Sequence, residues 1–503
     1  MTRNEILGFV SAEPELPNTF YCWIALRDID KVKKDEFVTI VDAKRKDTLF
    51  IGYVVDIYNQ TVALKSFSRE EMLRSSIEAE QIIKGALSRP EYFKVYAKVK
   101  LLYKIVNNSV ALVDTPPTDT SSVTKQYLQL LPLILGFSSD CNKSIHIGKL
   151  YANGDIDVCL DLNRMLAGHI AIFGQTGSGK SYAAGVIIEE VTSRGVPVVV
   201  FDHMGEYLSM SKAIDGGKGI NIIHLAPGSN ITLDFEDIMK APQILLSLGV
   251  TDAQLNLLKD AYTEAVNHRF KGLDALKWLL TDVITQKGTR KRLYLIGRSR
   301  GYSTATIDGL RWKLEALLSR GIIGQGFDIK NFIKPGYLTV IDLTDVDASN
   351  RSLVVATMLS KIAEARKRKL IPPLLVVIEE AHNYVSRDET PSSLIIRDFI
   401  RSARHWGIGV MLISQRPAGL HTDALNIINT HIIFRLKGTD LEYVKQFAPF
   451  TKEELEDVQR LPEGAAYITG PIIRGGLSVK IVIRKRRTMH GGESVEFVKT
   501  FSE

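Results

Sequence analysis

The sequence predicts a mixed α/β protein. We expect a core with a parallel-dominated sheet, a helical insertion within that core, and a small β-barrel domain ahead of it. After about residue 145, apolar strand-like runs alternate with helical segments, which is typical of a parallel sheet covered on both faces. Before about residue 110, short runs rich in Val, Ile, Tyr and Phe are separated by turn or charged residues, which indicates a small barrel or sandwich.

Composition limits the class of protein. The chain has 503 residues, of which 45% are hydrophobic and 24% charged, as in ordinary globular proteins. No apolar run reaches the ~20 residues that span a bilayer, and the N-terminus lacks a signal-peptide core. Cys22, Cys141 and Cys159 show no disulfide or metal spacing. We therefore expect a cytoplasmic protein that does not enter the membrane. The net charge of +7 permits nucleic-acid binding without proving it.

The first 142 residues are predicted to be the barrel domain with its linker. A helix is expected at about 69–85, and the polar, proline-rich segment 114–122 is expected to be the linker. The expected strands are Ile6–Val10, Thr19–Leu26, Glu36–Val41, Leu49–Ile57 and Tyr92–Ile105.

Residues 143–485 are predicted to be the α/β core, with the helical insertion at about 236–335 and a tail at 486–503. Thr251 and Thr451 each begin a capping-box pattern that predicts a helix start. The expected core strands are Ile170–Phe173, Val196–Phe201, Ile220–Leu225, Leu338–Leu343, Leu374–Ile378, Val410–Ser414 and Ile432–Leu436.

A phosphate-binding loop follows the first core strand. Residues 174–181 read Gly-Gln-Thr-Gly-Ser-Gly-Lys-Ser, which matches G-x-x-x-x-G-K-[ST] in full. Glycines let backbone N–H groups surround phosphate oxygens, and the following helix N-terminus adds its positive dipole end. Lys180 would reach the β- and γ-phosphates, and Ser181 would bind Mg²⁺. The alternative, a glycine-rich turn without a ligand, is disfavoured by the strand and helix on either side. The motif predicts ATP and Mg²⁺ as ligands, and the nucleotide-binding residues are Gly174, Gln175, Thr176, Gly177, Ser178, Gly179, Lys180, Ser181 and Tyr182.

Acidic residues follow two other core strands, at the edge of a parallel sheet where ligands gather. Glu379 is predicted to hold the Mg²⁺ shell, through water, and Glu380 to orient and polarise the attacking water. Asp202 and Glu206 are expected at the same edge, with Asp202 as a further metal ligand. The alternatives are a solvated acidic pair at a strand end and a turn with Asp at a helix start.

A neutral amide and several arginines complete the predicted site. Gln415 ends a core strand and could hydrogen-bond the γ-phosphate or the water; the alternative is an ordinary loop residue. Arg397, Arg401 and Arg404 are spaced so that they would share one helix face. Hydrolysis of ATP needs extra positive charge in the transition state, which a neighbouring subunit often supplies. We favour Arg404 for this role, with Arg401 and Arg416 as other candidates.

Together these elements resemble the HerA family of archaeal and bacterial DNA translocases, within the HerA–FtsK group of RecA-like P-loop ATPases. The resemblance covers most of the chain. It departs from the family at Asp202-His-Met-Gly-Glu-Tyr, where Asp-Pro-His-Gly-Glu-Tyr is common, so the roles of His203 and Met204 are open. The other segments that carry it are Leu160–Arg164, His169–Ser181, Val377–His382, Ile413–Pro417 and Leu461–Gly464.

The resemblance implies a small N-terminal barrel, a homohexameric ring with double-stranded DNA in its pore, and ATP-driven translocation or unwinding. It also implies a NurA-type nuclease and the double-strand-break repair nuclease complex as partners in DNA-end resection. The C-terminal tail would reach the neighbouring subunit.

Three basic runs are candidates for holding DNA phosphates, although the alternative for each is a solvated surface patch. The basic runs are Lys287–Arg292 with Arg298 and Arg300, Arg366–Lys369, and Arg484–Arg487.

Three rival functions are disfavoured by the sequence. A conjugation or secretion motor would commonly carry membrane helices. A nucleotide-switched clamp or scaffold would have less need of Glu380, and a small-molecule P-loop kinase is usually shorter.

Overall fold

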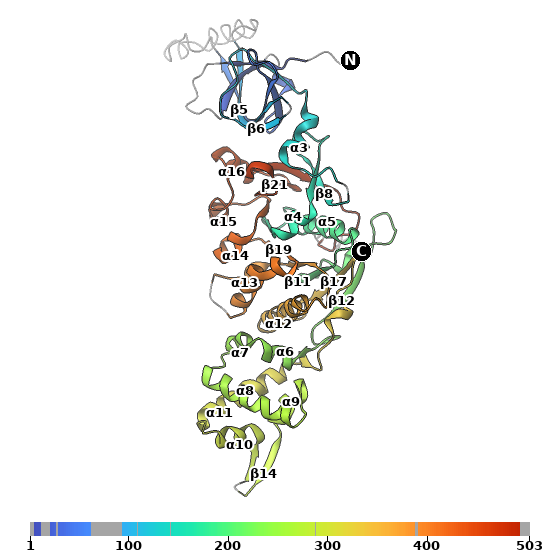
Figure 1. The fold of residues 1–503 in the computed structure, drawn as a ribbon, viewed down its shortest axis with the longest axis vertical. Helices are drawn as coiled ribbons and strands as arrows, with labels where there is room; N and C mark the ends of the chain where they lie inside the picture. The colour runs from blue at the N-terminus through green and yellow to red at the C-terminus, as the bar shows by residue number, and fades with distance from the viewer. Residues whose placement is uncertain are drawn as a thin grey trace, which may run out of the picture. The chain divides into compact units, whose positions relative to one another are not determined.

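The computed structural model divides the chain into two compact units (Figure 1). It describes residues 5–11, 21–26, 29–61, 93–107, 109–140, 142–286, 288–387 and 391–492. Unit 1 comprises residues 1–139, 148–159 and 479–482, and unit 2 comprises residues 140–147, 160–478 and 483–503. The expected helix at 69–85 lies outside the described residues.

Unit 1 is built around a β-barrel. Its strands are hydrogen-bonded in the order β2-β1-β7-β3-β4-β5-β6, and a further pairing of β2 with β5 closes the barrel. Alternate side chains of these strands, such as Ile24, Val38 and Phe50, are buried in its interior. The barrel of the predicted fold class is therefore confirmed. The elements are β1 (Gly8–Ser11), β2 (Tyr21–Leu26), β3 (Phe37–Val41), β4 (Thr48–Thr61), β5 (Phe93–Val106), β6 (Ser109–Leu112), β7 (Ser122–Thr124) and α3 (Leu131–Leu135).

The segment expected to be a linker is a loop between two strands of this barrel. Asp42 accepts hydrogen bonds from the backbone N–H of Thr118 (2.9 Å) and from its hydroxyl (2.8 Å). Strand β7 then pairs with both β1 and β3. A proline-rich composition favours irregular structure in a loop as much as in a linker, so composition alone could not separate the two.

Unit 2 contains a sheet in which strands run in the order β12-β17-β11-β18-β19-β10-β20-β21. All its pairings are parallel except that of β20 with β21. The predicted parallel-dominated core is thus confirmed. The strands are β10 (Ile170–Phe173), β11 (Val198–Asp202), β12 (Asn221–Leu225), β17 (Tyr337–Asp342), β18 (Leu374–Ile378), β19 (Ile408–Ser414), β20 (Thr430–Ile433) and β21 (Ala465–Thr469).

Some strands differ from the sequence prediction. β20 starts at Thr430, two residues earlier than expected, and ends at Ile433, because the apolar run continues into the loop beside β10. Phe434 is buried there without being in a strand, and a Cβ on Gly174 would lie 2.6 Å from its Cβ. Strands β8 (Ser144–Leu150), β9 (Asp157–Asp161), β21 and β22 (Val479–Ile483) were not predicted.

Helices pack against the core strands, with α5 beside β10 and β11 and α13 beside β19. The helix α5 follows the phosphate-binding loop. The helices α12 and α13 pack against each other, and both precede β19 in the sequence. No helix of the described residues is long and apolar enough to span a bilayer. The core helices are α4 (Leu162–Ala167), α5 (Lys180–Ser193), α12 (Ala348–Lys367), α13 (Pro391–Ala403), α14 (Thr422–Ile427), α15 (Gly438–Val444) and α16 (Lys452–Val458).

The insertion is a helical bundle with a β-hairpin at its end (Figure 1). Thr251 forms the predicted capping box with Gln254. The buried side chains Leu257, Leu276 and Leu310 belong to the same hydrophobic cluster as the core sheet, so the insertion and the sheet share one core. Its elements are α6 (Phe235–Lys240), α7 (Pro242–Ser247), α8 (Asp252–Asn267), α9 (Gly272–Leu279), α10 (Arg292–Ser299), α11 (Thr304–Ser319), the strand pair β13 (Leu233–Asp234) and β16 (Ile323–Gly324), and the hairpin β14 (Asp282–Thr285) and β15 (Gly288–Lys291).

Candidate functional site

The phosphate-binding loop lies between β10 and α5, as the motif predicts. Gly177 and Gly179 have φ angles of 71° and 108°, a left-handed region that favours glycine. A Cβ on Gly174 would lie 2.5 Å from the Ser178 hydroxyl oxygen. The hydroxyl of Ser178 donates to the carbonyl oxygen of Gln175 (2.7 Å) and holds the loop closed on itself. The glycines therefore serve a backbone shape that side chains would prevent.

Lys180 is the first residue of α5, and only 8% of its surface is exposed. Its ammonium group donates to the carbonyl oxygen of Gln175, 3.1 Å away. Burial lowers the pKa of this ammonium, whereas the nearby carboxylates of Glu380, Glu206 and Glu379 raise it. The fold thus holds one cation among three acids at the mouth of the loop.

Asp202 and Glu379 lie side by side at the carboxyl ends of two paired strands. β11 and β18 run parallel with Phe201 opposite Ile378, so the residues that follow are neighbours. Both side chains are buried, with exposures of 0% and 2%. Burial raises the pKa of both groups, and the charge of Asp202 raises that of Glu379 further. A cation at this edge would relieve the repulsion.

The two carboxylates differ in what they bind. Asp202 accepts hydrogen bonds from the backbone N–H groups of Gly205 (2.7 Å), Glu206 (3.2 Å) and Tyr207 (3.0 Å), so it shapes the turn after β11. Glu379 accepts from the N–H of His203 (3.0 Å) and of Met204 (3.2 Å) through one oxygen, Oε2.

Glu380 occupies a strained position next to this pair. Its backbone is left-handed (φ 45°, ψ 47°), which is costly for a residue with a side chain. Its buried Oε2 has no hydrogen-bond partner among the described residues, although Nδ1 of His382 lies 3.2 Å away. Burial raises the pKa of this carboxyl, against the charge of Lys180 and a hydrogen bond from the Gln415 backbone. A strained backbone and an unsatisfied buried oxygen are typical of functional residues.

Gln415 links the end of β19 to the phosphate-binding loop. Its side-chain oxygen accepts a 2.8 Å hydrogen bond from the hydroxyl of Thr176. The preceding residue, Ser414, is 3.1 Å from Nδ1 of His382 through its hydroxyl. His382 therefore lies within reach of both Ser414 and Glu380. Sequence reasoning assigned no role to His382, although it stands in the Val377–His382 motif.

The arginines do not share one exposed face. The side chain of Arg397 is 11% exposed. It contacts His421 and Asp423 of the same chain, at the start of α14, so the carboxylate of Asp423 offsets part of its charge. Arg401 is 63% exposed. Arg404 lies just after α13, in the short turn before β19, and is exposed. The three arginines therefore differ in exposure and in partners, and Arg404 lies just beyond the end of α13.

Arg404 and Arg416 lie at opposite ends of β19. Seven residues of strand separate them, which is about 20 Å. Arg416 is near enough to Glu380 for its charge to lower the pKa of that carboxyl. Arg416 is therefore at the nucleotide edge of its own subunit, whereas Arg404 is at the other edge of the sheet.

Residues 484–492, which lead from the core into the C-terminal tail, pack on α5 of the same chain. Arg484 forms ion pairs with Glu189 and Glu190, each 2.9 Å long. The backbone N–H of Arg486 donates to the hydroxyl of Tyr182 (2.8 Å). Gly492, the last described residue, lies beside Glu206 at the nucleotide edge, because a Cβ on Gly492 would lie 2.5 Å from the Glu206 carboxylate. No sequence pattern marked this contact. Residues 493–503 lie outside the described part of the chain.

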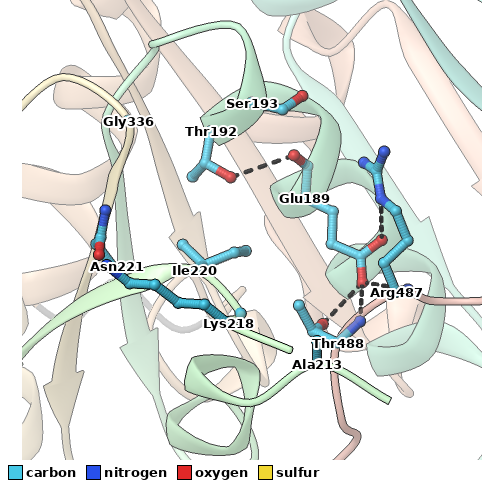
Figure 2. Close-up of a pocket in the computed structure, with 11 residues that line it drawn as sticks. Glu189, Thr192, Ser193, Ala213, Lys218, Ile220, Asn221, Gly336, Arg487 and Thr488 are labelled. Carbon is cyan, nitrogen blue, oxygen red and sulfur yellow. Dashed lines mark hydrogen bonds and ion pairs between the residues drawn. The ribbon is translucent and has the colours of Figure 1, made fainter. Parts of the chain in front are cut away.

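A cavity of about 320 Å³ lies behind this contact (Figure 2). Glu189 points toward Thr488 and Arg487 at its rim, and Thr488 donates to it through both its backbone N–H (2.8 Å) and its hydroxyl (2.7 Å). Glu189 is nine residues beyond Lys180 on α5, about 14 Å along the helix. The cavity is thus separate from the phosphate-binding loop.

The residues present fit a nucleoside triphosphate with Mg²⁺. The loop leaves its glycines in phosphate-binding conformations, and Lys180 is held at its mouth by a single backbone carbonyl. No cluster of three or more His, Cys, Asp or Glu among the described residues could hold a metal alone. Magnesium in such sites binds one or two protein ligands together with substrate phosphates and water, so Ser181 and Glu379 would suffice to hold it.

Comparisons with known proteins agree with this site. The family described as "Helicase HerA, central domain" matches residues 145–362. The DNA double-strand break repair helicase HerA of Pyrococcus furiosus is 27% identical over 95% of this chain and 92% of the relative. The protein of that name from Sulfurisphaera tokodaii is 30% identical over 81% of each chain.

A solved structure shares the fold. VirB4 of Thermoanaerobacter pseudethanolicus superimposes with a TM-score of 0.50, covering 69% of this chain and 98% of that chain at 19% identity. Identity at that level shows the fold alone. The relatives by sequence, by contrast, align over both units and through the phosphate-binding loop. The chain belongs to the HerA family of helicases, which are P-loop ATPases.

Proposed function

We propose that this ATPase acts on double-stranded DNA, along which it moves as a homohexameric ring, and that it works with a NurA-type nuclease in resecting ends at double-strand breaks. The observation that carries the catalytic part is the grouping of Lys180, Glu379 and Glu380 at one sheet edge, with a buried oxygen on Glu380 that accepts no hydrogen bond among the described residues. The name of the relatives, DNA double-strand break repair helicase, supports the DNA part.

Each residue of the site has a distinct task in this proposal. Lys180 and the loop N–H groups bind the phosphates, and Ser181 and Glu379 hold Mg²⁺, which neutralises phosphate charge when bound. Glu380 orients and polarises the attacking water. Its raised pKa makes it a better proton acceptor than an exposed carboxylate, provided that it is ionised. Asp202 supports Glu379 by fixing the turn whose N–H groups bind that carboxylate.

The position of Arg404 supports a ring. About 20 Å of strand lies between it and the nucleotide edge of its own sheet, so it cannot reach its own phosphates. An exposed arginine in this place could complete the site of a neighbouring subunit, as a heterologous ring interface requires. Arg416 and Arg401 are the other candidates, of which Arg416 would act within its own subunit.

The proposal is tested by measuring ATP hydrolysis of the full chain with and without linear duplex DNA, with Lys180→Ala as the blank. We expect a several-fold rise with duplex that the blank lacks. A rate that duplex leaves unchanged would favour the second candidate, a nucleotide-switched clamp or scaffold.

A further inference from the structure

Two of the three basic runs are used inside the protein. The guanidinium of Arg366 donates to the carbonyl oxygens of Trp406 (2.7 Å) and Ile371, and so ties α12 to the chain before β19. Arg484 and Arg487 are paired with the acids of α5, the latter at 2.7 Å. The charges of Arg484 and Arg487 are thus offset within unit 2, and the guanidinium of Arg366 is held by carbonyl oxygens. These runs are therefore poor candidates for a nucleic-acid surface.

The third run has a different setting. Within residues 282–300, the described residues form the hairpin β14–β15 and the helix α10, at the end of the insertion (Figure 1). We call this segment the basic ribbon. It carries six Lys or Arg residues and one acid, Asp282, which pairs with Lys291 across the hairpin at 3.3 Å. The surrounding residues 251–320 have 13 Lys or Arg against 7 Asp or Glu, a net charge of +6 where the whole chain has +7. Nearly all of the protein's net positive charge thus lies in one part of its insertion.

The cations of the basic ribbon have weak internal partners. Arg290 is exposed and lies over the ring of Tyr294, 5.5 Å from its centre. Arg298 follows Tyr294 by four residues on α10, so these two side chains lie on the same helix face. The guanidinium of Arg298 donates to a backbone carbonyl oxygen. Arg300 is 3.7 and 3.8 Å from two carboxylates on α8, and such exposed pairs contribute little. No close carboxylate neutralises Arg290 or Arg298 among the described residues.

We propose that the basic ribbon binds the phosphate backbone of double-stranded nucleic acid. This inference rests on the proposed function and names a surface for it. A two-stranded β-ribbon is narrow enough for the major groove of a duplex, and its arginines suit phosphate oxygens. Its aromatic ring, that of Tyr294, is covered by Arg290, so the described part of the ribbon offers no open platform on which single-stranded bases could stack. Phosphate contacts carry no base sequence, which a moving protein requires.

The exposure of the ribbon supports a role in binding another molecule. Ile284 on β14 is 87% exposed, and a two-stranded ribbon is only marginally stable by itself. Ile284 and Thr289 face each other across the hairpin, on the side opposite Arg290. One face of the hairpin thus carries Arg290 beside Val283, and the other carries Ile284 and Thr289 beside the Asp282–Lys291 ion pair. The charge of Arg290 favours a polyanion over a protein as the occupant of the first face.

The test uses the full-length protein and two double variants. Arg290→Ala with Arg298→Ala removes two exposed cations of the ribbon that have no carboxylate partner among the described residues. Arg368→Ala with Lys369→Ala removes two exposed cations of a different basic run and is the matched control. Fluorescence anisotropy with a labelled duplex of arbitrary sequence, at several salt concentrations, measures the affinity. ATP hydrolysis without DNA, measured in parallel, reports whether the variants remain folded and active.

We expect the ribbon variant to bind duplex about tenfold more weakly or worse, with a slope of log affinity against log salt shallower by about 2, because two phosphate contacts are lost. The control variant should bind like the wild type, and both should keep their DNA-independent ATPase rate. Equal losses of affinity in both variants would overturn the assignment, because removing any two surface cations would then weaken duplex binding.

Two further outcomes separate this inference from the proposed function. If the wild type binds duplex and the ribbon variant binds equally well, the surface is wrong while the function stands, and Ile284 would instead suit a protein partner. If the wild type itself has no measurable affinity for duplex, the proposed function and this surface both fail.

Discussion

The hydroxyl of Thr176 in the phosphate-binding loop donates a 2.8 Å hydrogen bond to the side-chain oxygen of Gln415 at the end of β19. This contact joins the loop that would bind the γ-phosphate to the strand that ends beside Glu380, whose carboxylate accepts a hydrogen bond from the Gln415 backbone. In the proposed function, Gln415 would link the bound phosphate to Glu380 through these two contacts.

Thr176→Val should disrupt this link. The side chain keeps its shape but loses the donor, so we expect nucleotide affinity to change little and the maximal hydrolysis rate to fall by about tenfold or more. Thr176→Ser, which keeps the hydroxyl, should hydrolyse ATP at close to the wild-type rate. Steady-state kinetics with both variants measure this. Equal rates for Val and Ser would show that the hydrogen bond has no catalytic role.

Glu380→Gln should bind ATP and fail to hydrolyse it, with a loss of roughly 10²–10⁴-fold in rate. The pH profile gives an independent check. Burial raises the pKa of Glu380, so the ionised form, and with it the rate, should be lost at a higher pH than for an ordinary Glu as the pH falls. The residual rate of the Gln variant should lack this acid limb. An acid limb that persists in the variant belongs to another group.

The sequence allowed the catalytic edge to be predicted but not its surroundings. Gly174–Ser181 and the Glu379–Glu380 pair follow strands whose apolar runs are unmistakable, and a parallel sheet brings such strand ends together whatever the rest of the chain does. The side of α13 on which Arg397 points depends on His421, which is distant in sequence. No local pattern can report such a contact.

For the fold, too, some features could be predicted from the sequence and others could not. Alternation of apolar runs and helices predicted the parallel sheet, and the helical periodicity of 236–335 predicted the insertion. The hairpin β14–β15 was missed because Asp282–Lys291 is short and polar, and its strands pair only with each other. The docking of residues 484–492 on α5 was missed for another reason. It depends on Glu189 and Glu190, which in the sequence look like ordinary helix-surface acids.

Arg404→Ala should block hydrolysis with little loss of ATP binding, because the residue would act on the neighbour's nucleotide. Mixing this variant with Lys180→Ala tests the trans arrangement. Each variant is inactive alone, but a mixed ring contains some interfaces with an intact Lys180 on one side and an intact Arg404 on the other. Hydrolysis by the mixture above the sum of its parts is the expected result. Mixtures that remain inactive, from subunits shown to co-assemble, would place Arg404 outside the site.

Glu379→Gln should make the nucleotide-free protein more stable and less active. Folding raises the pKa of Glu379, so burying this carboxyl costs stability increasingly as the pH rises above the ordinary Glu value toward the folded value. Gln avoids that cost and can still accept the N–H groups of His203 and Met204. We expect a melting midpoint higher by about 2–4 °C at pH 8. The gain should shrink at pH 5; a gain that does not depend on pH would point to packing instead of charge.

Translocation along duplex DNA is the central claim, and displacement of a triplex-forming oligonucleotide from a linear duplex measures it most directly. We predict that the full-length protein displaces the third strand with ATP and Mg²⁺, and that Lys180→Ala with ATP does not. The same protein given a non-hydrolysable ATP analogue should also leave the triplex intact. Duplex-stimulated ATP hydrolysis without any displacement would contradict the account, because ATP would then be consumed on DNA without movement.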